Sequence, residues 1–300
     1  MTDRHTIDDS SVVYAFSPDL EPSVTVEPRA ALTVETRDSL EGAVQRDGDL
    51  MESVPEEVNA ATGPIAVEGA EPGDALRVEI EAIRPTEDRG RAVTIPGFGL
   101  LRDDPEVAHP HTRVTPVEDG ALRFGDLSVP LDPCIGTIGV ATADEEYTTL
   151  VPHDHGGNLD TTDLRAGATV YFPVFQPGGL LAMGDCKAAM ADGEHCGTGA
   201  EIATEIDVTL GVVGDAPLSR PLIETDDAWT FLASAETLQT ACELAVRDAS
   251  EALARAHGGE FTDAYLLASL IADLEISQVV DPLKTVRCAV PKGYLADPLD

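Results

Sequence analysis

Residues that could do chemistry are concentrated in one segment of the chain, residues 152–201. Three of the seven histidines, two of the five cysteines and a run of carboxylates lie there among paired glycines. Carboxylates and imidazoles supply the oxygen and nitrogen ligands that calcium, zinc and similar cations take in proteins. Glycines permit the tight loops that bring such ligands to one point. We therefore interpret this segment as the candidate active site.

Asp185, Lys187 and Glu194 are the candidate catalytic residues of this segment, in the stretch GDCKAAMADGE. An acidic residue framed by glycines and apolar strand residues is costly to bury unless it is paired or bound to a metal. The chain has few lysines, so we interpret the place of Lys187 between the acids as specific. We expect it to pair with Asp185 or Glu194 and to have a raised pKa, because nearby carboxylates favour the charged ammonium. Its role would then be electrostatic, and the adjacent Cys186 would be a small buried apolar residue.

The composition limits the class of protein. An apolar content of 43% in 300 residues is enough for a substantial core. The sequence has no uncharged apolar run long enough to predict a membrane span, and its start does not resemble a secretory signal. We expect a cytoplasmic protein in which the five cysteines stay reduced.

The charge of the chain is strongly negative, with 55 acidic against 19 basic residues and a net charge of −36. Such a chain repels itself at low salt, and the repulsion is screened at molar salt. We therefore expect a halophilic protein that works in a high-salt cytoplasm. The absence of a basic stripe excludes nucleic acid as a partner.

The pattern of apolar residues predicts strands first and helices late. Short apolar runs lie between Gly, Pro and Asp clusters, and a further run at 285–290 could return to the sheet. Helical periodicity covers 237–257, which Gly258 and Gly259 would end. A second helix should begin at Thr262 and turn Leu266, Leu267, Leu270, Ile271 and Leu274 inward. Many strands followed by few helices predict an α+β fold. The predicted strands are 32–36, 75–83, 92–95, 135–141, 168–175 and 206–213.

A weak internal similarity relates 63–78 to 157–170, since both run from a glycine through acidic residues to a Gly-closed turn and a strand. Two alike β-turns would explain it by chance, and two related β lobes would explain it by duplication. We expect one domain over 1–300, divisible into lobes at 1–145 and 146–300.

Four segments of the chain resemble the acetamidase/formamidase family. They lie at 59–80, 155–160 (HGGNLD), 172–201 and 264–282, in the same order along the chain. The resemblance implies a β-rich fold of two stacked lobes and a homodimer. It also implies a metal-assisted amidohydrolase that cleaves short linear amides, such as formamide and acetamide, to a carboxylate and ammonia.

The resemblance also suggests site residues. It implies a divalent metal, zinc or else calcium, for which Asp160, His155, Asp185 and Asp38 are the candidate ligands. Asn158 and Gly157 would bind the substrate. The family pattern has His where this chain has Lys187, and a cationic lysine is a poor metal ligand. Either Lys187 replaces the metal electrostatically, or other residues hold the metal. Further candidates are His153, Asp192 and His195.

Other hydrolase motifs, namely the HExxH helix and the GxSxG elbow, are missing from the sequence. Two functions remain open. One is the amidohydrolase, and the other is a divergent paralogue, with catalysis altered or lost, that binds a small molecule. Lys187 is the residue that separates them.

Overall fold

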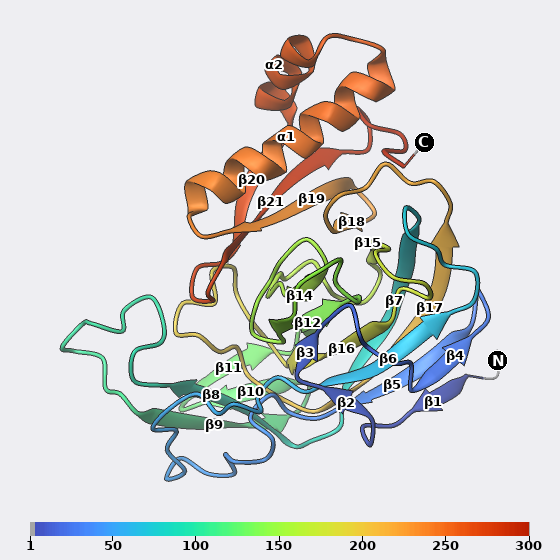
Figure 1. The fold of residues 1–300 in the computed structure, drawn as a ribbon. Coiled ribbons are helices and arrows are strands. Elements are labelled where there is room, and N and C mark those ends of the chain that lie inside the picture. The colour runs from blue at the N-terminus through green and yellow to red at the C-terminus, as the bar shows by residue number, and fades with distance from the viewer. Residues whose placement is uncertain (1–3, 300) are drawn as a thin grey trace.

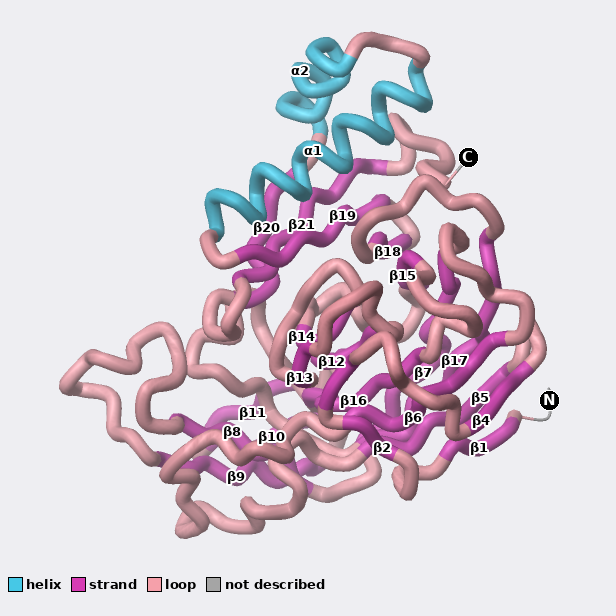
Figure 2. Tube along the Cα trace, viewed as in Figure 1, coloured by secondary structure: helices cyan, strands magenta, loops and turns pink. Residues whose placement is uncertain are grey.

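β-strands make up most of the structure, a computed structural model that describes residues 4–299 (Figures 1 and 2). Buried and half-buried residues alternate along strand β5 (Ala31–Thr36), as the pleat of a strand requires. β5 belongs to a nine-stranded sheet. The order of that sheet is β1 (His5–Ile7), β5, β17 (Thr204–Val213), β7 (Ala75–Pro85), β15 (Thr169–Pro173), β18 (Leu222–Glu224), β19 (Ala228–Ala235), β21 (Lys284–Pro291) and β20 (Asp273–Gln278).

A six-stranded sheet packs against this one. Its central strands are buried along their whole length, because both of their faces are covered. Val34 and Ile80 of the larger sheet share one apolar core with Ile65, Ile138 and Met183 of the smaller. The strands of the smaller sheet are β14 (Gly156–Asn158), β12 (Cys134–Gly139), β16 (Leu181–Lys187), β6 (Ala61–Val67) and β2 (Val12–Val13), with β4 (Val24–Val26) parallel to β6.

Two small sheets complete the β structure. The pair β13 (Tyr147–Thr148) and β3 (Ala15–Phe16) is antiparallel. A four-stranded sheet forms a separate extension at the lower left of Figure 1. It consists of β8 (Arg89–Thr94), β9 (His111–Glu118), β10 (Ala121–Phe124) and β11 (Leu127–Pro130).

The two helices follow β19. Helix α1 (Leu238–His257) begins at the N-cap Thr237 and ends at Gly258 in a left-handed conformation, as predicted, and packs on β19 and β21. No helix within residues 4–299 is long and apolar enough to cross a membrane. These observations confirm the α+β class, the return of the last apolar run to the sheet as β21, and the six predicted strands to within a few residues at their ends.

The prediction for α2 (Phe261–Ile271) was wrong in its cap and in three of the five residues expected to face inward, whereas Leu267 and Ile271 do pack against the core. Leu266 and Leu270 are 59% and 82% exposed, and Leu274 lies beyond the helix on the edge strand β20. The small residues Ala264 and Ala268 face α1 instead, since they allow the two helices to approach closely. Glu260, not Thr262, is the N-cap, and it makes no side-chain capping bond.

Candidate active site

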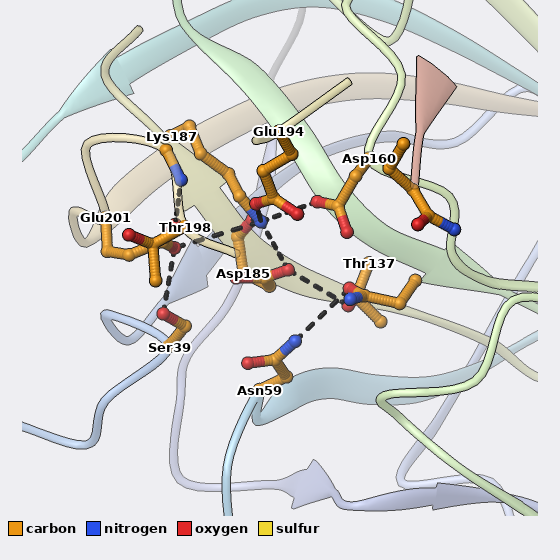
Figure 3. A network of polar contacts seen from close by, with 12 residues as sticks. Ser39, Asn59, Thr137, Asp160, Asp185, Lys187, Glu194, Thr198 and Glu201 are labelled. Atoms are coloured by element: carbon orange, nitrogen blue, oxygen red, sulfur yellow. Dashed lines mark hydrogen bonds and ion pairs between the residues drawn. The ribbon is translucent and has the colours of Figure 1, made fainter. Parts of the chain in front are cut away.

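The candidate site lies where strands of the six-stranded sheet end (Figure 3). Thr137 is in β12, and Asp185 and Lys187 end β16. Asn158 ends β14, and Asp160 follows it after one residue. Three further acids arrive on loops from elsewhere in the chain. These are Glu194 and Glu201, between β16 and β17, and Asp281, between β20 and β21.

Lys187 is the centre of this cluster and is 1% exposed. Its Nζ lies 2.7 Å from Oδ1 of Asp160 and 2.5 Å from Oδ2 of Asp185. Carboxylate oxygens of Glu194 and Glu201 follow at 3.6 and 3.8 Å. One ammonium is therefore shared by four buried carboxylates, which confirms the predicted pairing of Lys187.

The amide of Asn158 orders the other side of the cluster. Its Nδ2 donates to Oδ2 of Asp281 at 3.0 Å. Its Oδ1 accepts from Nδ2 of Asn59, at 3.2 Å, and from the hydroxyl of Thr137. Because both ends of the amide are engaged, Asn158 holds Asp281 in place.

Glu201 is fixed by two hydrogen bonds of its own. The hydroxyl of Ser39 donates to Oε2 and the backbone N–H of Gly199 donates to Oε1, both at 2.8 Å. Glu201 also has its backbone paired with Arg91, next to the four-stranded sheet. Its carboxylate therefore has a defined position at the edge of the cluster.

The backbone is strained at four residues of the site. Asn59, Asp160, Asp185 and Glu194 have φ values of 55°, 41°, 53° and 43°, in the left-handed region that favours glycine. Such residues cost free energy, and they concentrate at functional sites, where the surrounding structure enforces them. Four of them in one cluster indicate a site that is held for chemistry rather than for stability.

Two glycines make room for Lys187. A Cβ on Gly136 would overlap its Nζ and the carboxylate of Asp185, and a Cβ on Gly199 would overlap its Cγ. Neither glycine has a positive φ, so space and not backbone conformation requires them. The ion cluster therefore depends on missing side chains as well as on charged ones.

Burial and charge oppose each other in the cluster. Burial lowers the pKa of Lys187, but the negative charges of Asp160, Asp185, Glu201 and Glu194 raise it well above its ordinary value, as predicted. Burial is the largest cause that raises the pKa of the acids, well above the ordinary range for three of them. Lys187 is thus favoured in its charged form, while burial shifts the acids around it toward their protonated form. The acids with raised pKa are Asp185, Glu194, Glu201 and Asp281.

The cluster opens into a small cavity of about 40 Å³. A buried water needs roughly 10–15 Å³ measured in this way, so the cavity has room for about three or four non-hydrogen atoms. One part of its wall is polar and the rest is apolar. The apolar residues are Leu40, Val54, Val58, Ile95, Phe98 and Leu150. The polar residues are Ser39, Asn59, Asn158, Asp185, Lys187, Glu194, Thr198, Glu201 and Asp281.

Three of the carboxylates could hold a metal ion. Oxygens of Asp160, Glu194 and Asp281 lie within 4.8 Å of one another. Oδ2 of Asp160 is buried and has no hydrogen-bond partner, so a ligand could satisfy it. All-oxygen ligand sets suit hard cations such as calcium or magnesium, whereas zinc usually takes nitrogen or sulfur. The residues present therefore fit a hard divalent cation.

Four predicted site residues do not line the cavity. Asp160 contacts Lys187 within the cluster. His155 is buried against Phe16 and Tyr147 and lines a different pocket. Asp38 accepts backbone N–H bonds from Leu40 and Gly42 and so shapes the loop that carries Ser39. Gly157 has a φ of 87°, and a Cβ there would overlap the carbonyl oxygen of Val151. Gly157 therefore allows its backbone to approach that of Val151 closely.

The further candidates also lie elsewhere. Asp192 binds Arg287, His195 is exposed, and His153 stacks on Tyr147. Cys186 is fully buried in the apolar core between the two large sheets, as predicted. The structure thus brings together Asp160, Asp185, Lys187, Glu194 and Asn158 from the predicted set.

Two acids of the cluster, Glu201 and Asp281, were not predicted. Both lie in segments that carry the family resemblance, 172–201 and 264–282, which is the signal that could have found them. Ser39, Asn59 and Thr137 were missed as well. Asn59 opens a third such segment, 59–80, whereas Ser39 and Thr137 have no local motif.

Comparison with known proteins supports one family. The model of the acetamidase/formamidase family matches residues 2–146 and 140–293. A formamidase of Methylophilus methylotrophus is 29% identical in a match of 265 residues, and the match covers 69% of this chain. The chain spans about 65% of the length of that relative and of an acetamidase from Mycolicibacterium smegmatis, which is 25% identical.

Solved structures agree along nearly the whole chain. A predicted acetamidase/formamidase from Thermoanaerobacter tengcongensis superposes with a TM-score of 0.93 and 37% identity, covering 97% of this chain and 98% of that one. An acetamidase from Bacillus halodurans has a TM-score of 0.92 and 34% identity, with 96% and 98% covered. Because both sequence and structure match over most of its length, this chain belongs to the acetamidase/formamidase family.

Proposed function

We propose that this protein hydrolyses the C–N bond of short linear amides such as formamide and acetamide, releasing a carboxylate and ammonia. The observation that supports this most is the buried cluster of one lysine and five carboxylates on a cavity that suits a very small substrate. The names of the relatives, formamidase and acetamidase, point the same way.

Amide hydrolysis needs an activated water, a polarised carbonyl group and an acid for the departing nitrogen. Asp185 lines the cavity beside Lys187, and its carboxyl group can accept a proton from a water bound there. Glu194 lines the cavity, and burial raises its pKa, so it is suited to donate a proton to the leaving nitrogen. Lys187 fixes the positions of Asp160 and Asp185.

We further propose that the reaction is metal-assisted. In that case Asp160, Glu194 and Asp281 would hold the metal as carboxylates, and Glu201, which also lines the cavity and whose pKa burial raises, would supply the proton in place of Glu194. The all-oxygen set favours calcium over the zinc expected from the family. A bound metal would lower the pKa of water and polarise the substrate carbonyl group. Lys187 would limit the affinity, because its ammonium lies 2.7 Å from one of these carboxylates.

A catalytically altered paralogue that binds a small molecule is the second candidate. The substitution of Lys187 for the family histidine is the observation that favours it, since Lys187 occupies the centre of the cluster.

The test is ammonia release from formamide and acetamide by protein purified in high salt, together with its metal content. We expect turnover of both amides. Binding of these amides without ammonia above background would overturn the hydrolase and support the paralogue. Full activity of a protein that holds no metal after treatment with a chelator would overturn the role of the metal but not the hydrolase.

We also propose that the protein is a homodimer in a high-salt cytoplasm. The charge of −36 supports the salt requirement. The melting temperature should rise between roughly 0.1 M and roughly 3 M KCl, a range over which screening changes greatly. An unchanged melting temperature would exclude the salt requirement. Light scattering would show the number of subunits.

A further inference from the structure

The wall of the cavity has polar and apolar residues, which suit the two parts of an amide substrate. The carboxylates and Lys187 offer hydrogen-bonding partners to the amide group. The apolar residues of the wall come from two loops and from the turn that carries Leu150. An amide bound with its polar group toward Lys187 therefore turns its acyl group toward this apolar wall.

Phe98 is the apolar residue of the wall that packs on the loop carrying Glu194. Its ring lies directly on Gly197, since a Cβ there would overlap ring atoms Cδ1 and Cε1 of Phe98. Gly197 follows Glu194 by three residues, and its N–H donates to the Glu194 carbonyl oxygen at 2.8 Å. Phe98 thus rests on the loop that supplies an acid of the site.

The contact between these two loops is built at several points. The N–H of Leu100 donates to the carbonyl oxygen of His195 at 2.8 Å. A Cβ on Gly99 would overlap the carbonyl oxygen of Cys196, so the two backbones approach closely there. Thr198 bonds the backbone of Val93 through its hydroxyl group. The ring of Phe98 is therefore held in one position relative to Glu194.

We propose that Phe98, seated on Gly197, sets the upper limit on the length of the acyl group, so that the site takes amides with one or two acyl carbons and rejects longer ones. The inference rests on the proposed function and names its substrate class. A cavity of about 40 Å³ that must also admit the attacking water leaves little space beyond a one- or two-carbon acyl group.

The experiment measures kcat/KM for formamide, acetamide, propionamide and butyramide in the wild-type protein, Phe98→Ala and Phe98→Trp. Wild type should lose activity steeply beyond acetamide. Phe98→Ala should raise the ratio of butyramide to formamide activity by roughly fourfold for each methylene accommodated, from about 0.8 kcal/mol per methylene. Phe98→Trp should lower the acetamide to formamide ratio.

Leu101→Ala is the matched control, because Leu101 follows in the same loop but is 57% exposed and does not line the cavity. It should leave the ratios unchanged. Wild-type activity that is equal on butyramide and formamide, or ratios that Phe98→Ala does not alter, would overturn the inference.

Thermal shifts produced by the same amides serve as a second measurement. If no variant releases ammonia, the proposed hydrolysis fails, but the size limit is still tested by binding. Stabilisation by formamide and acetamide alone, extended to butyramide in Phe98→Ala, would support the limit. Equal stabilisation of the wild-type protein by all four amides would contradict it.

Discussion

Lys187 and Arg287 each gather several carboxylates, yet the two clusters differ in their access to water. The four carboxylates around Lys187 are at most 4% exposed. Those around Arg287 are 21–45% exposed. The partners of Arg287 are Asp163, Asp192 and Glu275, at 3.2, 2.7 and 2.7 Å.

Each cation lowers the pKa of its acids, but around Lys187 burial outweighs this effect. Asp192 and Glu194 stand two residues apart in one motif. Although burial alone would raise the pKa of Asp192, hydrogen bonds from Arg287 and Thr162 lower it. Burial and the charge of Asp160 raise the pKa of Glu194 well above the ordinary range. The first acid forms a structural ion pair, and the second can exchange protons.

The two clusters should differ most, in stability and in activity, when the cation of each is removed. Lys187→Met leaves buried carboxylates without a counter-charge, which should cost about 3–5 kcal/mol of the free energy of unfolding and abolish activity. Arg287→Met leaves acids that water can reach, so we expect a loss of about 1–3 kcal/mol. Folded Arg287→Met should keep wild-type kcat. Urea unfolding and ammonia release measure both, and an inactive but folded Arg287→Met would break the comparison.

The space around Lys187 should matter next. Gly136→Ala pushes a methyl group into Lys187 and Asp185, and such overpacking costs about 1–3 kcal/mol. Activity should fall with stability, because the ion pair is displaced. Gly48→Ala is the control, since nothing lies within 4 Å of a Cβ there. Equal melting temperatures of the two variants would show that the cluster tolerates the methyl group.

The smallest effect is the opposite dependence of stability on pH in the two clusters. The pKa of Asp192 is lowered on folding, so its stabilisation is present above its unfolded pKa and is lost as the pH falls through its folded pKa. The pKa of Glu201 is raised well above its ordinary value, chiefly by burial, so this acid reduces stability as the pH rises from its unfolded toward its folded pKa.

Unfolding curves with a chelator present measure both dependences. Asp192→Asn should approach wild-type stability at low pH, whereas Glu201→Gln should gain on wild type as the pH rises. A pair of variants with the same pH profile would show that the burial of Glu201 has no such effect.

Local patterns in the sequence predicted much of the fold. Alternation and turn residues located the main strands, and Thr237 and Gly258 marked the ends of α1. The orientation of α2 could not be predicted, because the alanines Ala264 and Ala268 are buried while larger side chains are exposed. Which face of a short apolar helix is buried depends on its neighbour and not on its own pattern.

The site was predictable only where its residues are close in sequence. Asp185 and Lys187 are two residues apart on one strand and so share a face, which is why their pairing could be predicted. Asp281 reaches Asn158 across 123 residues, and Ser39 reaches Glu201 across 162. These contacts depend on how the sheets pack. His155 is a suitable ligand by type, but the turn before β14 places it against Phe16 and Tyr147.

The central claim is that the buried cluster around Lys187 performs hydrolysis, and the two acids of the shared motif test it most directly. Glu194→Gln and Asp192→Asn each replace a carboxyl group by an amide and keep the shape of the side chain. Measured by ammonia release from formamide, Glu194→Gln should lose about 100-fold or more in kcat, the range for a proton-transferring group. Asp192→Asn should keep kcat within about threefold. Near wild-type turnover in Glu194→Gln, with its fold intact, would contradict the account.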